Sequence, residues 1–143
     1  MFVKEIMTTD VRTIRPEDTV KVLAQEMIKY KIGSLVVVEG SGEVVGIATE
    51  RDIIEDIILL GKSPEEIKVR DIMTKDLVTI NPSSTLEEAA ELMVNHKIKK
   101  LPVIEKGRLV GIVTATDLIA YENRLVEKIA TLIMASPMKN IGG

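Results

Sequence analysis

Two short segments of the sequence contain a threonine followed three residues later by an aspartate, and these side chains can both start a helix and bind a polar ligand. The first segment, GIATERD, ends at Asp52, and the second, GIVTATD, ends at Asp117. In each, a β-branched run leads to the threonine and a helical pattern begins near the aspartate. The threonine hydroxyl can accept a hydrogen bond from an early helix N–H while the aspartate reaches back in a capping box. The pattern therefore predicts, twice, a strand that ends where a helix begins.

The same geometry can serve a ligand. A helix N-terminus presents free N–H donors and the positive end of the helix dipole to an anion such as a phosphate. The threonine hydroxyl adds a donor, and an aspartate near the helix start can accept both hydrogens of a ribose cis-diol. Phosphate and ribose together describe a nucleotide. Capping and binding are compatible, so the pattern alone leaves both interpretations open.

These segments belong to a long internal repeat. Residues 3–40 match residues 69–106 at a shift of about 66 residues, and nearly half of the paired positions are identical. One extra residue near Gly42 then changes the register, in a turn where an insertion is tolerated. Two copies with so long a period predict a pair related by a pseudo-twofold axis rather than an open array. We expect a first domain at residues 1–65, a second at 66–124 and a C-terminal helical extension at 125–143.

Each copy has the same predicted order of elements: strand, helix, strand, strand, helix. Apolar residues at helical spacing after Pro16 and after Pro82 predict the first helix of each copy. Short β-branched runs predict a hairpin in each copy, at 35–38 with 44–48 and at 101–104 with 109–113. A second apolar helix follows each hairpin. The predicted fold class is therefore α/β in the broad sense, more narrowly α+β, built from two βαββα repeats.

Composition excludes several classes of function. The 143 residues contain no Cys and one histidine, His96, so thiolate chemistry and multi-histidine metal sites are excluded. With 2% aromatic residues and a net charge of −3, the chain lacks the stacking platforms and overall basic surface of nucleic-acid binders. Nucleic acid is therefore only a minor alternative partner, through the basic patch at 97–100. Without a nucleophile–base set or a P-loop, we expect no enzymatic activity, no catalytic cofactor and no metal. Because no signal pattern or apolar run of roughly 20 residues occurs, we expect a cytoplasmic protein that does not enter membranes.

The repeated motifs resemble the CBS domain, a family named after cystathionine β-synthase. They are Thr-Ile-x-Pro at 13–16 and 79–82, a following Thr-(Val/Leu), and Gly-Ile-(Ala/Val)-Thr-x-x-Asp. The resemblance covers residues 3–122, and the order, spacing and duplication of the motifs make it specific. It implies a tandem pair with two equivalent clefts across a pseudo-twofold axis. It also implies a regulatory module, such as an energy sensor, that binds AMP, ADP, ATP or S-adenosylmethionine, forms a homodimer and signals to an effector protein.

By this resemblance, two sets of residues are candidate nucleotide ligands. The first set surrounds Asp117, which would hold ribose, and comprises Thr114, Thr116, Lys99, Lys100, Thr8, Val11, Arg12 and Thr13. The second set surrounds Asp52 and comprises Thr49, Arg51, Gly33, Ser34, Thr74, Leu77, Val78 and Thr79. Gly33 and Ser34 replace Lys99 and Lys100 in the first copy, so we expect the Asp117 cleft to hold a phosphate-bearing ligand and the Asp52 cleft to be weaker or different. A solvated basic patch is the alternative role of these lysines and of Lys97.

Beyond the repeats, an apolar stripe at helical spacing continues through Leu125, Ile129, Leu132 and Ile133 before Ser136-Pro137. The stripe can extend the last helix over its own domain or over a second subunit, or it can dock on a separate effector protein. The alternative function for the whole chain is a scaffolding dimer with vestigial clefts, in which the Thr and Asp residues act only as caps.

Overall fold

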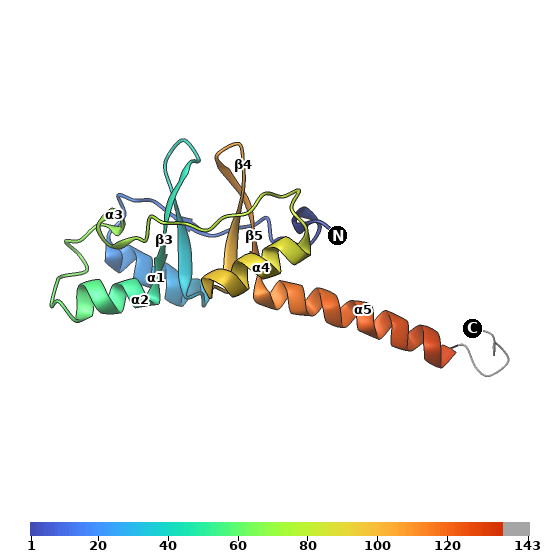
Figure 1. The fold of residues 1–143 in the computed structure, drawn as a ribbon. Coiled ribbons are helices and arrows are strands. Elements are labelled where there is room, and N and C mark those ends of the chain that lie inside the picture. Colours follow the sequence, from blue (N-terminus) through green and yellow to red (C-terminus); the bar gives the residue numbers. More distant parts are fainter. Residues whose placement is uncertain (136–143) are drawn as a thin grey trace.

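The computed structural model describes residues 1–135, and its elements follow the predicted order (Figure 1). The first repeat comprises β1 (Thr13–Ile14), α1 (Val20–Tyr30), β2 (Ser34–Val38), β3 (Val44–Thr49) and α2 (Glu50–Ile53), which continues into a π-helical turn, Ile54–Ile58. The second repeat comprises α4 (Leu86–His96), β4 (Lys100–Glu105), β5 (Arg108–Thr114) and α5 (Ala115–Ala135). A short 3-10 helix, Val3–Glu5, precedes the first repeat, and helix α3 (Val69–Ile72) precedes the second.

The strands form two small sheets, one in each repeat. β1 pairs in parallel with β2, which pairs antiparallel with β3. β4 and β5 form an antiparallel hairpin, and a single parallel bridge between Ile80 and Val103 stands where β1 stands in the first repeat. The two hairpins lie side by side, with the long helices gathered at one end of the strands (Figure 1). This arrangement confirms the α+β fold of two βαββα repeats.

The first helix of each repeat begins and ends in the same way. The Thr19 and Thr85 hydroxyls accept hydrogen bonds of 3.3 and 3.2 Å from backbone N–H groups three residues further on. Each helix ends at a lysine in the left-handed region, Lys31 at φ 56° and Lys97 at φ 55°. This turn directs the chain from the helix into β2 or β4, so the residues that follow each lysine lie at the helical end of a hairpin.

Each hydrophobic core contains a segment that precedes the other repeat in the sequence. Val69 of α3 is fully buried in the core of the first repeat, whereas Val3 is fully buried in the core of the second. Residues 67–73 therefore pack on the first repeat and residues 3–7 on the second. Each core is thus completed by the segment that leads into the other repeat, so the repeats exchange their leading segments.

Two crossing segments, residues 8–13 and 74–79, connect each exchanged segment to the repeat that follows it. Thr74 and Ile47 exchange backbone hydrogen bonds of 2.8 and 3.0 Å, and Thr8 and Ile112 exchange two of 2.9 Å. Each crossing segment thus starts against the last strand of one repeat and ends beside the hairpin of the other. In Figure 1 the green to yellow segment between α3 and α4 runs across both hairpins.

The last helix, α5, extends far beyond the body of the molecule (Figure 1). Leu118 in its first turns packs on the core of the second repeat, but the predicted stripe from Leu125 to Ile133 is 45% to 66% exposed. The stripe therefore does not cover its own domain. Residues 136–143 of the predicted extension, with Ser136-Pro137, lie outside the described residues. No helix within residues 1–135 is long and apolar enough to cross a membrane.

The close approach of the crossing segments predicts a steric effect at glycine. A Cβ added to Gly46 would lie 2.8 Å from the Met73 sulfur and 2.9 Å from the Thr74 carbonyl oxygen. Because that oxygen is backbone and is fixed by its hydrogen bond to Ile47, we expect Gly46→Ala to lower the free energy of unfolding by about 1–3 kcal/mol. Urea denaturation measures the change. Gly40→Ala is the control, since its Cβ would meet only the flexible end of Arg15, and equal effects of the two substitutions would contradict the packing argument.

Candidate functional site

The threonine and aspartate of each motif form a reciprocal capping box. The Asp52 carboxylate accepts from the Thr49 N–H at 2.9 Å, and the Thr49 hydroxyl accepts from the Asp52 N–H at 3.1 Å. Asp117 and Thr114 make the same two hydrogen bonds at 2.9 and 3.1 Å. The predicted capping arrangement is therefore confirmed in both repeats. It uses one oxygen of each carboxylate and leaves the other oxygen for a second partner.

A cavity of about 490 Å³, here called the Asp52 cleft, lies between the two repeats beside this cap. Its walls are Ser34, Ile47, Thr49, Thr74, Asp76, Leu77, Val78, Lys97, Ile98, Lys99, Lys100 and Pro102. Asp52 adjoins these walls because its second carboxylate oxygen accepts from the Thr74 hydroxyl at 3.4 Å. Five of the residues predicted for this site therefore come together around Asp52: Ser34, Thr49, Thr74, Leu77 and Val78.

The walls divide by chemistry. Ile47, Ile98 and Pro102 are apolar, and Leu77 and Val78 of the crossing segment add to this surface. The hydroxyls of Ser34, Thr49 and Thr74 supply polar groups, while Lys97, Lys99 and Lys100 supply positive charge and Asp76 one negative charge. An apolar surface with a few convergent polar groups is typical of sites for small organic ligands. The net positive charge favours an anionic one.

Lys100 occupies a special position in this cleft. Its ammonium donates a hydrogen bond of 3.0 Å to the Ser34 hydroxyl of the other repeat. Burial lowers the pKa of Lys100 below the usual value for a lysine, because a half-buried ammonium loses part of its hydration. Within the described chain, none of the ion pairs involves Lys97, Lys99 or Lys100. These ammonium groups are thus free to meet a ligand.

The structure places the lysines differently from the sequence prediction, which assigned Lys99 and Lys100 to the Asp117 cleft. Both residues line the Asp52 cleft, although the Lys99 carbonyl also accepts from the Ala115 N–H at 2.8 Å. The reason is the crossing segment at 74–79, which starts beside β3 of one repeat and ends beside β4 of the other. A cleft beneath it therefore takes one wall from β3 and the other from the start of β4.

Three residues of the predicted Asp52 set lie elsewhere. Arg51 points outward and pairs with Glu55 at 2.6 Å, and its side chain is 84% exposed. This carboxylate raises the pKa of Arg51. The Gly33 carbonyl accepts from the Glu50 N–H at 3.0 Å and caps the start of α2. Neither Gly33 nor Thr79 is among the residues that line the cleft.

The predicted Asp117 set is divided in the structure. Thr8 lies against Ile112, close to the strand that leads to Thr114, and Thr116 is exposed at the start of α5. The Arg12 guanidinium stacks on the Tyr30 ring at 4.0 Å, an interaction that holds the crossing segment against α1.

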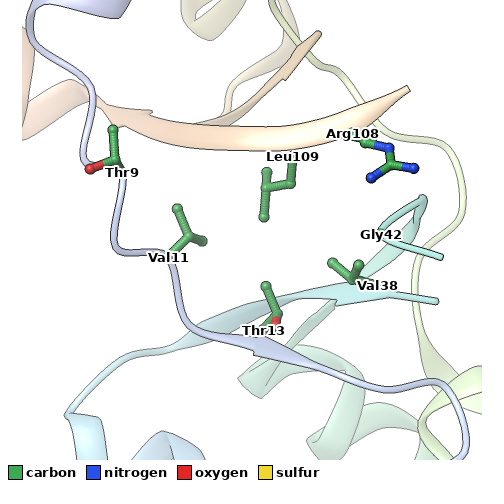
Figure 2. Close-up of a pocket in the computed structure, with 7 residues that line it drawn as sticks. All are labelled: Thr9, Val11, Thr13, Val38, Gly42, Arg108 and Leu109. Atoms are coloured by element: carbon green, nitrogen blue, oxygen red, sulfur yellow. The ribbon is translucent and has the colours of Figure 1, made fainter. Parts of the chain in front are cut away.

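Val11 and Thr13 line a different cavity of about 300 Å³ towards the hairpin tips (Figure 2). Its other walls are Thr9, Val38, Gly42, Arg108 and Leu109. Figure 2 shows Val11, Val38 and Leu109 around its centre and Arg108 at its rim. Val11 and Thr13 therefore share this cavity with residues of the hairpin tips.

The sequence prediction did not include five residues that line the Asp52 cleft: Ile47, Asp76, Lys97, Ile98 and Pro102. Ile47, Ile98 and Pro102 have the pattern of ordinary apolar residues in a strand or at a helix end. Asp76 lies in an irregular segment without a motif. Ile47 lies within the Gly-Ile-x-Thr motif and Lys97 lies in the basic patch with Lys99 and Lys100, but no signal in the sequence marks Asp76, Ile98 or Pro102. No group of three or more His, Cys, Asp or Glu side chains suited to a metal ion occurs in residues 1–135.

The fold and the paired caps define a tandem CBS-type module, and comparison with known proteins gives the family. A model of the CBS domain matches the chain twice, at residues 3–59 and 69–124. The chain therefore belongs to the CBS-domain family. Members of this family are generally regulatory modules rather than catalysts, and they often bind adenosine ligands and form oligomers.

Individual relatives agree with this assignment. The chain is 38% identical over 128 residues to the uncharacterized protein MK0525 of Methanopyrus kandleri, a match that covers 89% of this chain and 65% of that protein. It resembles the crystal structure of a putative acetoin utilization protein from Vibrio cholerae with a TM-score of 0.81 and 26% identity, over 96% and 98% of the two chains. It also resembles a hexameric CBS-CP12 protein from bloom-forming cyanobacteria, with a TM-score of 0.70 and 33% identity over 83% and 69%.

The capping boxes predict a measurable contribution to stability. Asp52→Ala removes the acceptor of the Thr49 N–H and the partner of Thr74, so we expect the free energy of unfolding to fall by about 1 kcal/mol. Thermal and urea denaturation both report this change. Glu122→Ala, an exposed change within α5, is the control and should leave stability nearly unchanged. An Asp52→Ala protein as stable as the control would show that the capping box adds nothing.

Proposed function

We propose that this chain is a regulatory module that binds an adenine nucleotide or a related adenosyl ligand, such as S-adenosylmethionine, in the Asp52 cleft. The observation that carries the proposal is the convergence of an apolar surface, a helix cap and three lysines on one cavity of about 490 Å³. A nucleotide presents the complementary parts: an apolar base, a diol and an anionic phosphate. Family membership supports the same ligand class.

Each part of the cleft has a proposed role. Ile47, Leu77 and Pro102 would contact the adenine ring. The second oxygen of Asp52 is engaged only by a long bond of 3.4 Å from Thr74, which a ribose hydroxyl can replace. The lysine side chains would meet the phosphates, because charge-assisted hydrogen bonds to phosphate are short and strong.

The Asp117 cleft is a second site in this proposal. Thr114 and Asp117 present the same cap there, and Thr8 lies beside the neighbouring strand. At the repeat positions equivalent to Lys99 and Lys100, which line the Asp52 cleft, the first repeat carries Gly33 and Ser34. We therefore propose that phosphate-rich ligands prefer the Asp52 cleft, the reverse of the ranking that the sequence suggests.

Binding can regulate a partner because the walls of the cleft come from both repeats. A ligand between β3 and the start of β4 would fix the two hairpins relative to one another. It would shift a conformational equilibrium only if it binds one arrangement more tightly than the other. The change would pass to an effector protein through the surface of the module.

The projecting helix α5 supports association with a second copy of the chain. Its stripe at Leu125, Ile129, Leu132 and Ile133 is exposed, and an isolated helix of this length is marginally stable in water. The likeness to the Vibrio cholerae protein covers 96% of the chain, a share too large to leave out the projecting part of α5. We propose a homodimer in which α5 of each protomer packs on its partner.

A scaffolding module is the alternative function. Its supporting observation is that both caps are already complete without a ligand, so the Thr and Asp residues have a structural role in any case. Thermal melting with added adenosyl ligands separates the two functions.

Ligand binding is expected to raise thermal stability. A ligand that binds only the folded chain adds about 2.7 kcal/mol at 100 times its Kd. We expect ADP or ATP, tested beside AMP and S-adenosylmethionine by thermal melting, to raise the Tm of the wild-type protein. The shift should be strongly reduced in Lys97→Met/Lys99→Met and little changed in Lys128→Met, a lysine on α5 outside the cleft. No shift with any of these ligands would favour the scaffold.

The dimer proposal predicts a change of mass. We expect wild-type protein to elute as a dimer in size-exclusion chromatography with light scattering. Ile129→Glu should yield a monomer, because it places a charge in the apolar stripe. Thr131→Glu adds the same charge on another face of α5 and should remain a dimer. A dimeric Ile129→Glu protein would show that α5 is not the interface, and a monomeric wild type would contradict the dimer itself.

A further inference from the structure

The contact between Lys100 and Ser34 joins equivalent positions of the two repeats. Residue 34 and residue 100 match at the repeat shift of about 66 residues, and the Lys100 ammonium donates to the Ser34 hydroxyl at 3.0 Å. Equivalent residues of two units related by a pseudo-twofold axis can touch only close to that axis. The contact therefore lies at the centre of the module.

This contact also lies between the two helix caps. Ser34 is paired with Thr49 in the β2–β3 hairpin, and Lys100 is paired with Thr114 in the β4–β5 hairpin. Each of these threonines begins the cap that carries Asp52 or Asp117. Lys100 thus belongs by its backbone to the strand pair of the Asp117 cap, while its side chain lines the Asp52 cleft.

At this central pair of positions there is one cation, not two. The repeat supplies serine at 34 and lysine at 100, so a single ammonium stands at the contact between the two repeats. It has no ion-pair partner in the described chain and is held by a neutral hydroxyl. Half-burial lowers the pKa of Lys100, which indicates a cation whose hydration is incomplete and that gains from an anionic partner.

We propose that the two clefts share Lys100, so that phosphate-bearing ligands bind to them anticooperatively. This inference rests on the proposed nucleotide-binding function. A phosphate in the Asp52 cleft draws the Lys100 ammonium away from Ser34 and from the Asp117 side. A phosphate in the Asp117 cleft holds it at the axis and denies it to the Asp52 cleft. The effect is reciprocal, since each ligand must lower the affinity of the other by the same factor.

The coupling is measured by isothermal titration with ADP. Asp117→Asn and Asp52→Asn each weaken one cleft, so the two variants give the affinity of the other cleft alone. The product of these two affinities, divided by the product of the two stepwise affinities of the wild type, is the coupling factor. We expect a factor of about 5 or more in the wild type. In the Lys100→Met background the factor should fall to about 1, and in Lys100→Arg it should persist because the charge is kept.

Adenosine is the matched ligand control. It has no phosphate to attract Lys100, so its two binding steps should be independent even in the wild type. A coupling factor of 1 for ADP in the wild type, or one unchanged by Lys100→Met, overturns the proposal. So does a stoichiometry of one ADP in both proteins. If no adenine nucleotide binds the wild type at all, the proposed function itself fails, and this outcome is distinct from two independent sites.

Substitutions of Asp52 or Asp117 also alter the helix caps and can lower stability. Native mass spectrometry of the wild type and Lys100→Met tests the coupling without these variants. The wild type should accumulate the singly bound chain over a wide range of ADP concentration. Lys100→Met should pass to the doubly bound chain over a narrower range. Identical distributions for the two proteins overturn the proposal.

Discussion

The structure depends on the backbone pairing that holds each crossing segment against the other repeat. Thr74 pairs with Ile47, and Thr8 pairs with Ile112, through two backbone hydrogen bonds each. These bonds bring the crossing backbone so close to Gly46 and Gly111 that an added Cβ would lie 2.9 Å from the Thr74 carbonyl oxygen or 3.0 Å from that of Thr8. Thr74 and Thr8 are the first residues of the two crossing segments, so this pairing joins the repeats and sets which core each leading segment enters. It also positions residues 74–78, which form one wall of the Asp52 cleft.

In the proposed function, stability and ligand binding use the same atoms at the helix starts. In Asp52 and in Asp117, one carboxylate oxygen accepts the hydrogen bond of the cap, and the other oxygen remains available for another partner. A helix whose first N–H groups are ordered by its own side chains is already arranged for an anion before one arrives. Preorganisation of this kind lowers the entropic cost of binding, since the groups that contact the ligand do not need to be ordered by it.

The two repeats share one backbone pattern but differ in the side chains that it carries. The backbone follows one pattern twice, down to the left-handed turns at Lys31 and Lys97. The side chains that follow these turns differ, with Gly33 and Ser34 in one copy and Lys99 and Lys100 in the other. Because the crossing segments place the start of β4 opposite β3, the lysines of the second repeat line the cleft beside Asp52 of the first. The long projecting helix α5, which only the second copy has, adds a second asymmetry at the periphery.

The sequence by itself determined the elements and their duplication. Apolar periodicity, the capping threonines and the Gly-Ile-x-Thr-x-x-Asp motif act over a few residues, so helices α1 and α4, both hairpins and both caps were predictable. The family and the α+β fold followed from the order of these local signals. The structure also brings together beside Asp52 five residues that the motifs had grouped with it: Ser34, Thr49, Thr74, Leu77 and Val78.

Only the tertiary structure decided which repeat supplies each wall of the Asp52 cleft. The assignment of Lys99 and Lys100 depends on how two hairpins meet across an axis, a contact between residues 66 positions apart in the chain. No local pattern carries that information, because a lysine at a strand start has the same periodicity whichever cleft it faces. The exchange of Val3 and Val69 between the cores is hidden for the same reason: buried valines fit either core, and only the path of the crossing segments separates them.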